Sequence, residues 1–391
     1  MRFISLLLAF SLIACPVLAG EKAPAPIKIG EFLSYTNLAN YAEPWKKGWT
    51  LALEEINAQG GVLGRPIEIV SRDDMGQPDQ AVRVMQEFAA DKDIVGVMGG
   101  VFSHVALAAS EIARREQTPL IIAYGATDKL LTANDPPYVF RVSPGTTVIA
   151  RILAREAAGL HIKRWAFVMP QYEMGESMER AFRAELTRLQ PDVQIVTTQW
   201  APLKKIQAGA VLGAVDRTQP DAVFVGLLGS DLTAFVREGG RRHSFDNRKI
   251  VTPFGGFRQE LGEMRNQVPD GWITFGYEAD IMQTPEHRAF VAHYRARFQK
   301  DPDEASMYGY IALKAYAQAL TKAGRVDRAA VRTALSGLSL ETPVGLTHIR
   351  ADNQILMGKW LGITAHDPQG HGNMRDVRYI SEEQLEKEPA P

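Results

Sequence analysis

The sequence predicts an α/β fold of two lobes, each built on a doubly wound parallel sheet that is covered by helices. Short apolar runs alternate with segments of helical spacing, and this pattern starts again after residues 142–146. Most of the apolar runs show little alternation of polar and apolar residues, which is typical of parallel strands covered on both faces. A chain of 391 residues has room for about two domains of roughly 150 residues each.

In the first block, apolar residues at helical spacing, such as Trp45, Trp49 and Ile56, predict a helix that ends near Asn57. Pro78 opens the next helix, because proline fits the first helical turn. The predicted order is a strand at 27–33, that first helix, a strand at 66–70, the Pro78 helix, a strand at 94–98, a helix at 103–115 and a strand at 119–125.

The second block repeats this alternation, and a further helical and β segment follows it. The predicted elements of the block are strands at 164–169, 193–198, 221–228 and 249–254, and helices at 176–189, 208–218 and from 231. After residues 271–280 come predicted helices at 285–299, 304–323 and 327–337, and strand candidates at 345–350 and 355–363. This extra segment indicates a chain that crosses between the lobes more than once.

The N-terminus predicts export. Residues 1–19 are interpreted as a secretory signal peptide cleaved after Ala19, because their apolar stretch is too short to span a bilayer comfortably. The alternative is a lipobox in which Cys15 is lipidated. Cys15 is the single cysteine, so cysteine catalysis and cysteine-based metal sites are excluded. The 44 basic and 45 acidic residues nearly balance, which argues against nucleic-acid binding.

Six turns that follow predicted strands are the candidate ligand-binding segments. In open parallel sheets, ligands bind beyond the carboxyl ends of the strands. Three of the turns belong to each block, so a cleft between two lobes would be lined by both sets. The turns are residues 34–45, 99–104, 123–129, 170–175, 226–231 and 254–258.

Several residues in these turns have two interpretations. Ser103 is either the N-cap of its helix or a hydroxyl donor to a ligand carboxylate beside free helix-end amides. His104 is either a ligand donor or a polar residue on an exposed turn. Thr127 offers a hydroxyl and an amide to a ligand, or forms a local turn. Tyr41 and Trp45 could form an aromatic wall, although Trp45 could equally anchor its helix in the core.

Enzymatic and metal chemistry are not predicted. No nucleophile elbow, phosphate-binding loop or dinucleotide fingerprint follows a predicted strand. Asp73 and Asp74 are adjacent on a strand and point to opposite faces, so they do not form a metal pair. We therefore expect neither a catalytic residue, nor a cofactor, nor a metal.

The chain resembles the periplasmic substrate-binding proteins of branched-chain amino-acid-type ABC importers, the leucine/isoleucine/valine-binding protein family. The resemblance rests on "EEINAQGGVLGRPIEIV…DD", "VGVMGGVFSHVALAA" and "PLIIAYGATDKL", and it continues through "DPDEASMYGYIALKAYAQAL" to "TPVGLTHIRADNQ". It implies the type I periplasmic binding fold, with three crossovers near residues 142–146, 276–280 and 343–345. Lobe I would comprise residues 27–143 and 278–342, and lobe II residues 144–277 and 343–391.

The resemblance also implies a function. The protein would be a periplasmic monomer that captures a small carboxylate-bearing solute and delivers it to ABC permease subunits in the inner membrane. The alternative is a sensor module on the same fold that signals to a partner.

The resemblance assigns one half of the ligand site clearly. Ser103, His104 and Thr127 would hold a ligand carboxylate, and the Gly125 carbonyl would accept from an α-ammonium. Tyr41 matches the tyrosine of the first loop.

The other half departs from the family pattern. Met174 stands where the family has a tyrosine, with Tyr172 nearby, and Leu228 stands at the next aromatic position. The family's acidic partner of the ammonium aligns near Phe254, where this chain has no acid. A buried ammonium without a counter-charge is costly. Either Asp231 or Glu278 replaces that acid, or the solute is an apolar or aromatic carboxylate without an amino group.

Overall fold

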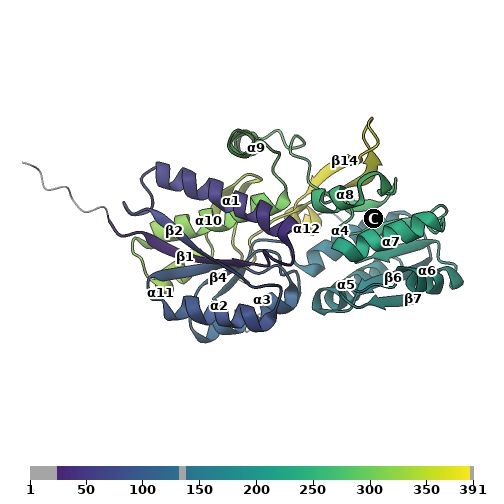
Figure 1. Ribbon diagram of the computed structural model, residues 1–391, viewed down its shortest axis with the longest axis horizontal. Coiled ribbons are helices and arrows are strands. Elements are labelled where there is room, and N and C mark those ends of the chain that lie inside the picture. The colour runs from purple at the N-terminus through teal and green to yellow at the C-terminus, as the bar shows by residue number, and fades with distance from the viewer. Residues whose placement is uncertain (1–23, 132–137, 388–391) are drawn as a thin grey trace, which may run out of the picture.

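A computed structural model of the chain describes residues 24–131 and 138–387. Figure 1 shows two lobes side by side. The chain begins in one lobe, and the teal segments form much of the other. The predicted signal peptide and Cys15 lie outside the described residues. Within those described ranges, no helix has the length and apolarity that crossing a membrane requires.

The first lobe contains a five-stranded parallel sheet in the order β2-β1-β3-β4-β5. Helix α1 packs against α10 on one face, and α2 packs against α3 on the other (Figure 1). The strands are β1 (Ile27–Leu33), β2 (Ile67–Asp73), β3 (Ile94–Gly99), β4 (Leu120–Ile122) and β5 (Val139–Arg141). The helices are α1 (Ala39–Ala58), α2 (Pro78–Ala90), α3 (Ser103–Arg115), α9 (Pro285–Phe298), α10 (Glu304–Ala323) and α11 (Arg328–Leu335).

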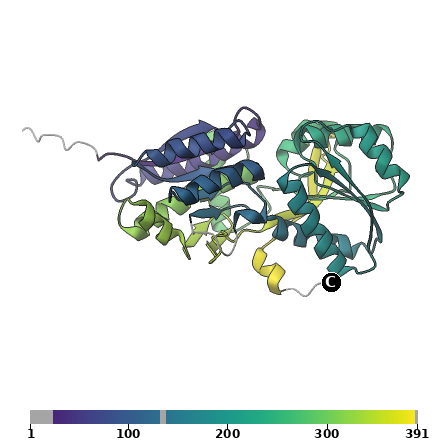
Figure 2. The same ribbon diagram turned by 90° about the horizontal axis from the view of Figure 1, so that it is seen from below.

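The second lobe contains a seven-stranded sheet in the order β14-β13-β10-β9-β8-β6-β7. Strands β6 to β10 are parallel, and β13 and β14 are antiparallel additions at one edge (Figure 2). The strands are β6 (Arg164–Pro170), β7 (Gln194–Ala201), β8 (Ala222–Val225), β9 (Lys249–Thr252), β10 (Ile273–Phe275), β13 (Lys359–His366) and β14 (Gly372–Ile380). The helices are α4 (Thr146–Gly159), α5 (Glu173–Leu189), α6 (Ala208–Arg217), α7 (Gly229–Arg241), α8 (Arg258–Met264) and α12 (Glu382–Lys387).

The two parallel sheets share one strand order, which confirms the doubly wound α/β prediction. In each lobe the first strand, β1 or β6, lies between the second and third strands of that lobe. The winding direction reverses beside this strand, and a ligand crevice forms beyond the carboxyl ends at such a point. The turns after β1 and β3 and those after β6 and β8 are therefore placed at the two crevices.

The chain passes between the sheets three times, but the third passage lies later than predicted. The first two follow β5 and β10, in agreement with the predicted segments 142–146 and 276–280. Residues 343–345, predicted as the third, form the turn of a hairpin between β11 (Ser339–Thr342) and β12 (Gly345–His348).

This hairpin stays with the first lobe because its apolar side chains have a core to enter there. Leu340, Ile349 and Ile355 are buried in the apolar cluster that includes α1 and α10. The chain joins the second sheet only at β13, so the first lobe extends past the predicted limit at residue 342. Strands β5, β10, β11 and β14 and helices α4, α8 and α12 were not among the predicted elements.

Candidate solute-binding site

All six predicted turns meet at one cavity between the lobes. Its volume is about 60 Å³, and none of its lining residues carries a formal charge. The lining residues are Leu38, Tyr41, Val101, Phe102, Ser103, Tyr124 and Ala126 from the first lobe, and Tyr172, Met174, Leu228, Phe254 and Phe257 from the second. The strand ends of both sheets thus build one aromatic and apolar chamber.

Four helices of ten or more residues begin at this chamber without a cap from the side chain of their own N-cap residue. In α7, the first amide, that of Gly229, is held instead by the Glu260 carboxylate. The N-cap residues of α1, α3, α5 and α7 are Leu38, Phe102, Tyr172 and Leu228, and none of them makes a side-chain capping hydrogen bond. All four also line the chamber. The first amides of a helix have no intrahelical partner, and they carry the positive end of the helix dipole. The chamber therefore favours an anionic group although it has no basic side chain in its wall.

Ser103 is the first residue of α3 and not its N-cap, so the capping interpretation is wrong. The N-cap is Phe102, whose ring cannot accept a hydrogen bond from the helix amides. The Ser103 side chain lines the chamber, and its Oγ accepts a hydrogen bond from the Thr127 amide at 3.3 Å. Its hydroxyl proton remains available to a ligand acceptor.

The turn before Ser103 requires glycine. Gly99 has a φ of 149°, and a Cβ built there would lie 1.8 Å from the carbonyl oxygen of Phe32. Because that close approach is to the backbone of the neighbouring strand β1, no side-chain movement can relieve it. The two strands thereby bring the start of α3 to the chamber.

Thr127 bridges the lobes. Its Oγ1 donates to Glu173 Oε1 at 2.8 Å and accepts from the Lys129 amide at 3.3 Å. Lys129 Nζ also donates to Glu173 Oε2 at 2.7 Å. The local-turn interpretation of Thr127 therefore holds in this structure, and its single hydroxyl proton is directed to a side chain of the other lobe.

This bridge predicts a modest contribution to solute affinity. Thr127→Val and Glu173→Gln are each expected to weaken solute binding about 2- to 10-fold, since a hydrogen bond contributes roughly 0.5–1.5 kcal/mol and this one exists only when the lobes meet. Titration calorimetry measures the affinity, and stopped-flow release should show faster dissociation. Glu185→Gln, which removes a pair within α5, is the control and should leave both unchanged. An unchanged dissociation rate in T127V and E173Q would contradict the bridge.

The Gly125 carbonyl is bonded to a guanidinium. Arg141 Nη1 lies 3.3 Å from the Gly125 oxygen, 3.0 Å from that of Ala126 and 2.9 Å from that of Thr127. The carbonyl to which the resemblance assigns an α-ammonium thus already faces a positive group, and a second cation there would be repelled.

Tyr41 lines the chamber and is tied to an acid that the sequence did not reveal. Its hydroxyl donates to Glu260 Oε1 at 2.8 Å, and the Gly229 amide donates to both Glu260 oxygens at 2.9 and 3.0 Å. Glu260 is fully buried in the first turn of α8. Burial raises the pKa of Glu260 to about 7, against the lowering effect of the bonds from Gly229 and Tyr41.

Four of the predicted contacts in the altered half line the chamber, namely Tyr172, Met174, Leu228 and Phe254. His104 does not line it. Its ring packs beside Phe102 and Tyr172, at centroid distances of 5.7 and 5.6 Å, and burial lowers its pKa. His104 therefore supports the aromatic wall from behind.

Three predicted residues lie elsewhere. Trp45 is fully buried in the core of the first lobe, where its Nε1 donates to Glu31 Oε1 at 2.9 Å, so the core-anchor interpretation is correct. Asp231 accepts from the Lys204 and Ile206 amides at 2.6 and 3.1 Å and thereby fixes a loop. Glu278 is in the connection after β10, and neither acid is among the lining residues.

Sequence reasoning missed several lining residues within the correct turns. Phe102, Tyr124 and Phe257 are the aromatic ones. Their position in the turns that follow strands was the available signal, but an aromatic residue in such a turn is equally typical of the core. Glu260 gave no signal, because an acid near a helix start is common on solvent-exposed helices as well.

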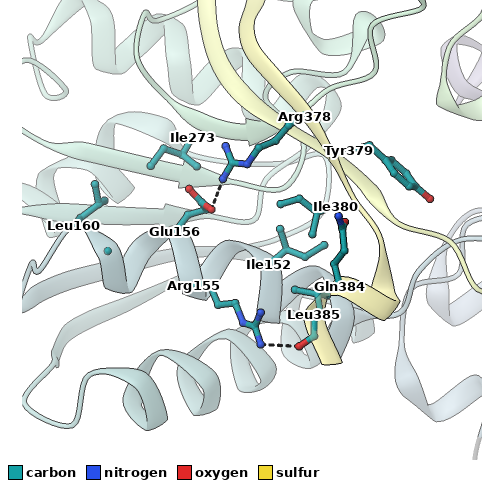
Figure 3. A pocket seen from close by; sticks show the side chains of 11 residues that line it. Ile152, Arg155, Glu156, Leu160, Ile273, Arg378, Tyr379, Ile380, Gln384 and Leu385 are labelled. Carbon is teal, nitrogen blue, oxygen red and sulfur yellow. Dashed lines mark hydrogen bonds and ion pairs between the residues drawn. The ribbon is translucent and has the colours of Figure 1, made fainter. Parts of the chain in front are cut away.

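A larger cavity of about 560 Å³ lies within the second lobe, between α4, β10, β14 and α12 (Figure 3). Its rim carries an ion pair between Glu156 and Arg378, and Arg155 donates to the Leu385 carbonyl at 2.7 Å. None of the six turns contributes to it. It therefore is not the site that the strand ends define.

The two-lobed fold and the interlobe chamber define a solute-binding protein. Residues 26–365 match the family model described as "Periplasmic binding protein", so the chain belongs to this family. The Leu/Ile/Val-binding protein homolog 7 of Brucella abortus (strain 2308) is 26% identical over an alignment of 358 residues that covers 84% of this chain and 86% of that protein. The protein is accordingly a solute-binding component of an ABC importer, and its family places it in the periplasm.

Solved structures share the fold. A solute-binding protein of an ABC transporter from R. palustris, in complex with benzoate, aligns with a TM-score of 0.79 and 22% identity over 92% of this chain and 98% of that one. The branched-chain amino acid binding protein LivJ of Streptococcus pneumoniae, in complex with isoleucine, aligns with a TM-score of 0.80 and 19% identity over 91% and 99%.

Proposed function

We propose that this protein captures a small apolar or aromatic carboxylate in the interlobe chamber and delivers it to the permease subunits of its importer. The observation that carries the proposal is the combination of an uncharged, aromatic wall with the N-termini of α1, α3 and α5, at which no N-cap side chain holds the first amides. The helix ends and the Ser103 hydroxyl would hold the carboxylate, and the rings would cover the rest of the solute.

The groups that would surround the α-ammonium of an amino acid support this choice of solute. The Gly125 carbonyl is turned to Arg141, and no acid lines the chamber. The fold itself does not decide, because one structural neighbour holds benzoate and another holds isoleucine. The chemistry of the chamber wall therefore distinguishes the two solute classes.

A branched-chain amino acid is the second candidate, and Glu260 is the observation that favours it. The carboxylate of Glu260 lies directly behind Tyr41 and beside Gly229, next to the chamber wall. An ammonium could take the place of the Tyr41 hydroxyl at this acid. The sensor function on the same fold stays a prediction that neither the structure nor the relatives test.

The thermal midpoint of ligand-free, refolded protein tests these candidates. A solute at about 100 times its Kd adds about 2.7 kcal/mol of stability, which a melting curve resolves. We expect a shift with benzoate or aliphatic acids and none with leucine, isoleucine or valine. A shift with the amino acids alone would overturn the proposal.

Glu260→Gln makes the test sharper. Binding of an amino acid should be lost in this variant, because the ammonium loses its counter-charge, whereas binding of a carboxylate without an amino group should persist. The control is Glu176→Gln, which changes an exposed carboxylate in the first turn of α5 and should leave the binding of both solute classes unchanged.

A further inference from the structure

A second chamber adjoins the solute chamber and shares a wall of three aromatic rings with it. The shared residues are Tyr41, Tyr124 and Phe257. The Tyr41 ring meets those of Tyr124 and Phe257 edge-on, at centroid distances of 6.0 and 6.3 Å. The second chamber has a volume of only about 10 Å³, so the rings close off most of the space behind them.

The second chamber, unlike the first, is lined by charged side chains. Its wall includes the carboxylates of Asp303 and Glu304 and the guanidinium of Arg258, together with Gln259 and Tyr277. Both Glu304 oxygens accept from Lys359 Nζ, at 2.8 and 2.6 Å. Asp303 accepts one bond from the Ser306 amide at 2.8 Å and another from the Gln259 side chain.

Asp303 would fix the orientation of an acid that reached both chambers. The carboxylate of that acid is favoured at the helix N-termini of the first chamber and repelled by Asp303 at the other end. Glu304 is neutralised by Lys359, and Arg258 is paired with Asp301 at 3.2 Å. A carboxylate has about four acceptor positions, and Asp303 uses two of them. A hydrogen-bond donor at the far end of a solute would therefore find an acceptor at Asp303.

Of the three rings in the shared wall, that of Tyr124 is the least constrained by polar contacts. Tyr41 is tied to Glu260, and the ammonium of Lys359 lies 4.9 Å from the centroid of the Phe257 ring. The Tyr124 hydroxyl makes no hydrogen bond to any residue within 24–131 or 138–387, and its ring is held by edge contacts with Tyr41 and with Tyr308 at 5.4 Å. Tyr124 follows β4 directly and reaches into the wall from the first lobe.

We propose that Tyr124 sets the length of the solute, and that the chamber behind it accepts a hydrogen-bond donor at the far end of a longer acid. The inference rests on the proposed capture of an apolar or aromatic carboxylate. It makes Tyr124 a specificity-determining residue, because its ring fills the space that a two-carbon extension of an aromatic acid would occupy.

Titration calorimetry with three probe acids tests this role. The probes are benzoate, 3-phenylpropionate and 3-(4-hydroxyphenyl)propionate. Wild-type protein should bind benzoate at least 10-fold more tightly than either longer acid. Tyr124→Ala should bind both longer acids at least 10-fold more tightly than wild type does, and benzoate more weakly. Tyr124→Phe keeps the ring and should keep the wild-type order.

Two further variants define the second chamber. In Tyr124→Ala, the hydroxylated acid should bind more tightly than 3-phenylpropionate, and adding Asp303→Asn should remove most of that difference. If the alanine variant does not fold, Tyr124→Leu removes the ring with a smaller loss of volume and carries the same expectations.

The outcomes separate the inference from the proposed function. Wild type could bind benzoate while Tyr124→Ala and Tyr124→Leu bind the longer acids no better than wild type does. In that case the role of Tyr124 is overturned and the proposed function stands. Equal binding of short and long acids by wild type would overturn it as well. Failure of wild type to bind any of the three acids, together with binding of an amino acid, would overturn both.

Discussion

Lys359→Met is expected to lower the free energy of unfolding by about 3–5 kcal/mol, the cost of leaving one buried charge without its partner. Lys359 opens β13, and its Nζ donates to both oxygens of Glu304, the first residue of α10. The two side chains are 5% and 8% exposed. Removing the ammonium leaves the carboxylate between the lobes, where water cannot solvate it well. Urea unfolding of the ligand-free protein measures the change.

A double variant at the same ion pair is expected to restore stability. Lys359→Met combined with Glu304→Leu should regain most of the lost stability, because replacing both members of a buried pair by apolar residues is often neutral or stabilising. Lys163→Met is the matched control. It removes an ion pair with Asp192 at 2.6 Å whose members are 65% and 56% exposed, and it should leave the free energy of unfolding essentially unchanged, because water screens exposed pairs. Equal effects of K359M and K163M would show that the buried pair has no special cost.

Solute affinity is expected to fall by roughly 15-fold as the pH rises from 5.5 to 7. Burial raises the pKa of Glu260 from 4.5 to about 7 in the closed structure, where Tyr41 of the other lobe covers it. When the lobes separate, Glu260 regains solvent and its ordinary pKa. At pH values between these two pKa values, closure therefore takes up a proton. The difference between the two pKa values corresponds to about 3 kcal/mol as an upper limit on the pH-dependent free energy of closure.

The sign follows from the raised pKa of the closed form. Below pH 4.5 the carboxyl is protonated in both forms, and its contribution to closure is fully present. As the pH rises through the closed-form value of about 7, that contribution is lost, and affinity becomes constant above it. Glu263 adds to the elevation through its negative charge. Tyr41 and Tyr124 stay neutral in this range, since burial raises the pKa of both hydroxyls well above 10.

Calorimetry in two buffers of different ionisation enthalpy measures the proton uptake directly. Near pH 6, close to one proton should be bound per solute, and Glu260→Gln should remove both the uptake and most of the pH dependence. Glu173→Gln, which removes a half-exposed interlobe pair, should keep them. A pH-independent affinity in wild type would contradict the coupling of Glu260 to closure.

The location of the site was predictable from the sequence, because it depends on where strands end. The carboxyl ends of parallel strands meet at one edge of a sheet, so apolar runs followed by turns were enough to bring Tyr41, Ser103 and Met174 to one chamber. The hydrogen-bond partners of the polar groups at that chamber were harder to predict from the sequence. Thr127 and Gly125 resemble ligand contacts along the chain, but in space Thr127 bonds to Glu173 of the other lobe, and the Gly125 carbonyl bonds to Arg141, the last residue of β5.

The sequence by itself determined the doubly wound two-lobe fold, the first two crossovers and the six turns at the cavity, since these follow from local apolar patterning and from the chain order of strands. Only the tertiary structure decided that Trp45 belongs to the core, that the β11–β12 hairpin stays with the first lobe, and that Glu260 is a buried acid at the lobe interface. Each of these depends on contacts between segments far apart in the chain. The burial of a side chain and the partner of a carboxylate are set by those contacts, and a local pattern contains neither.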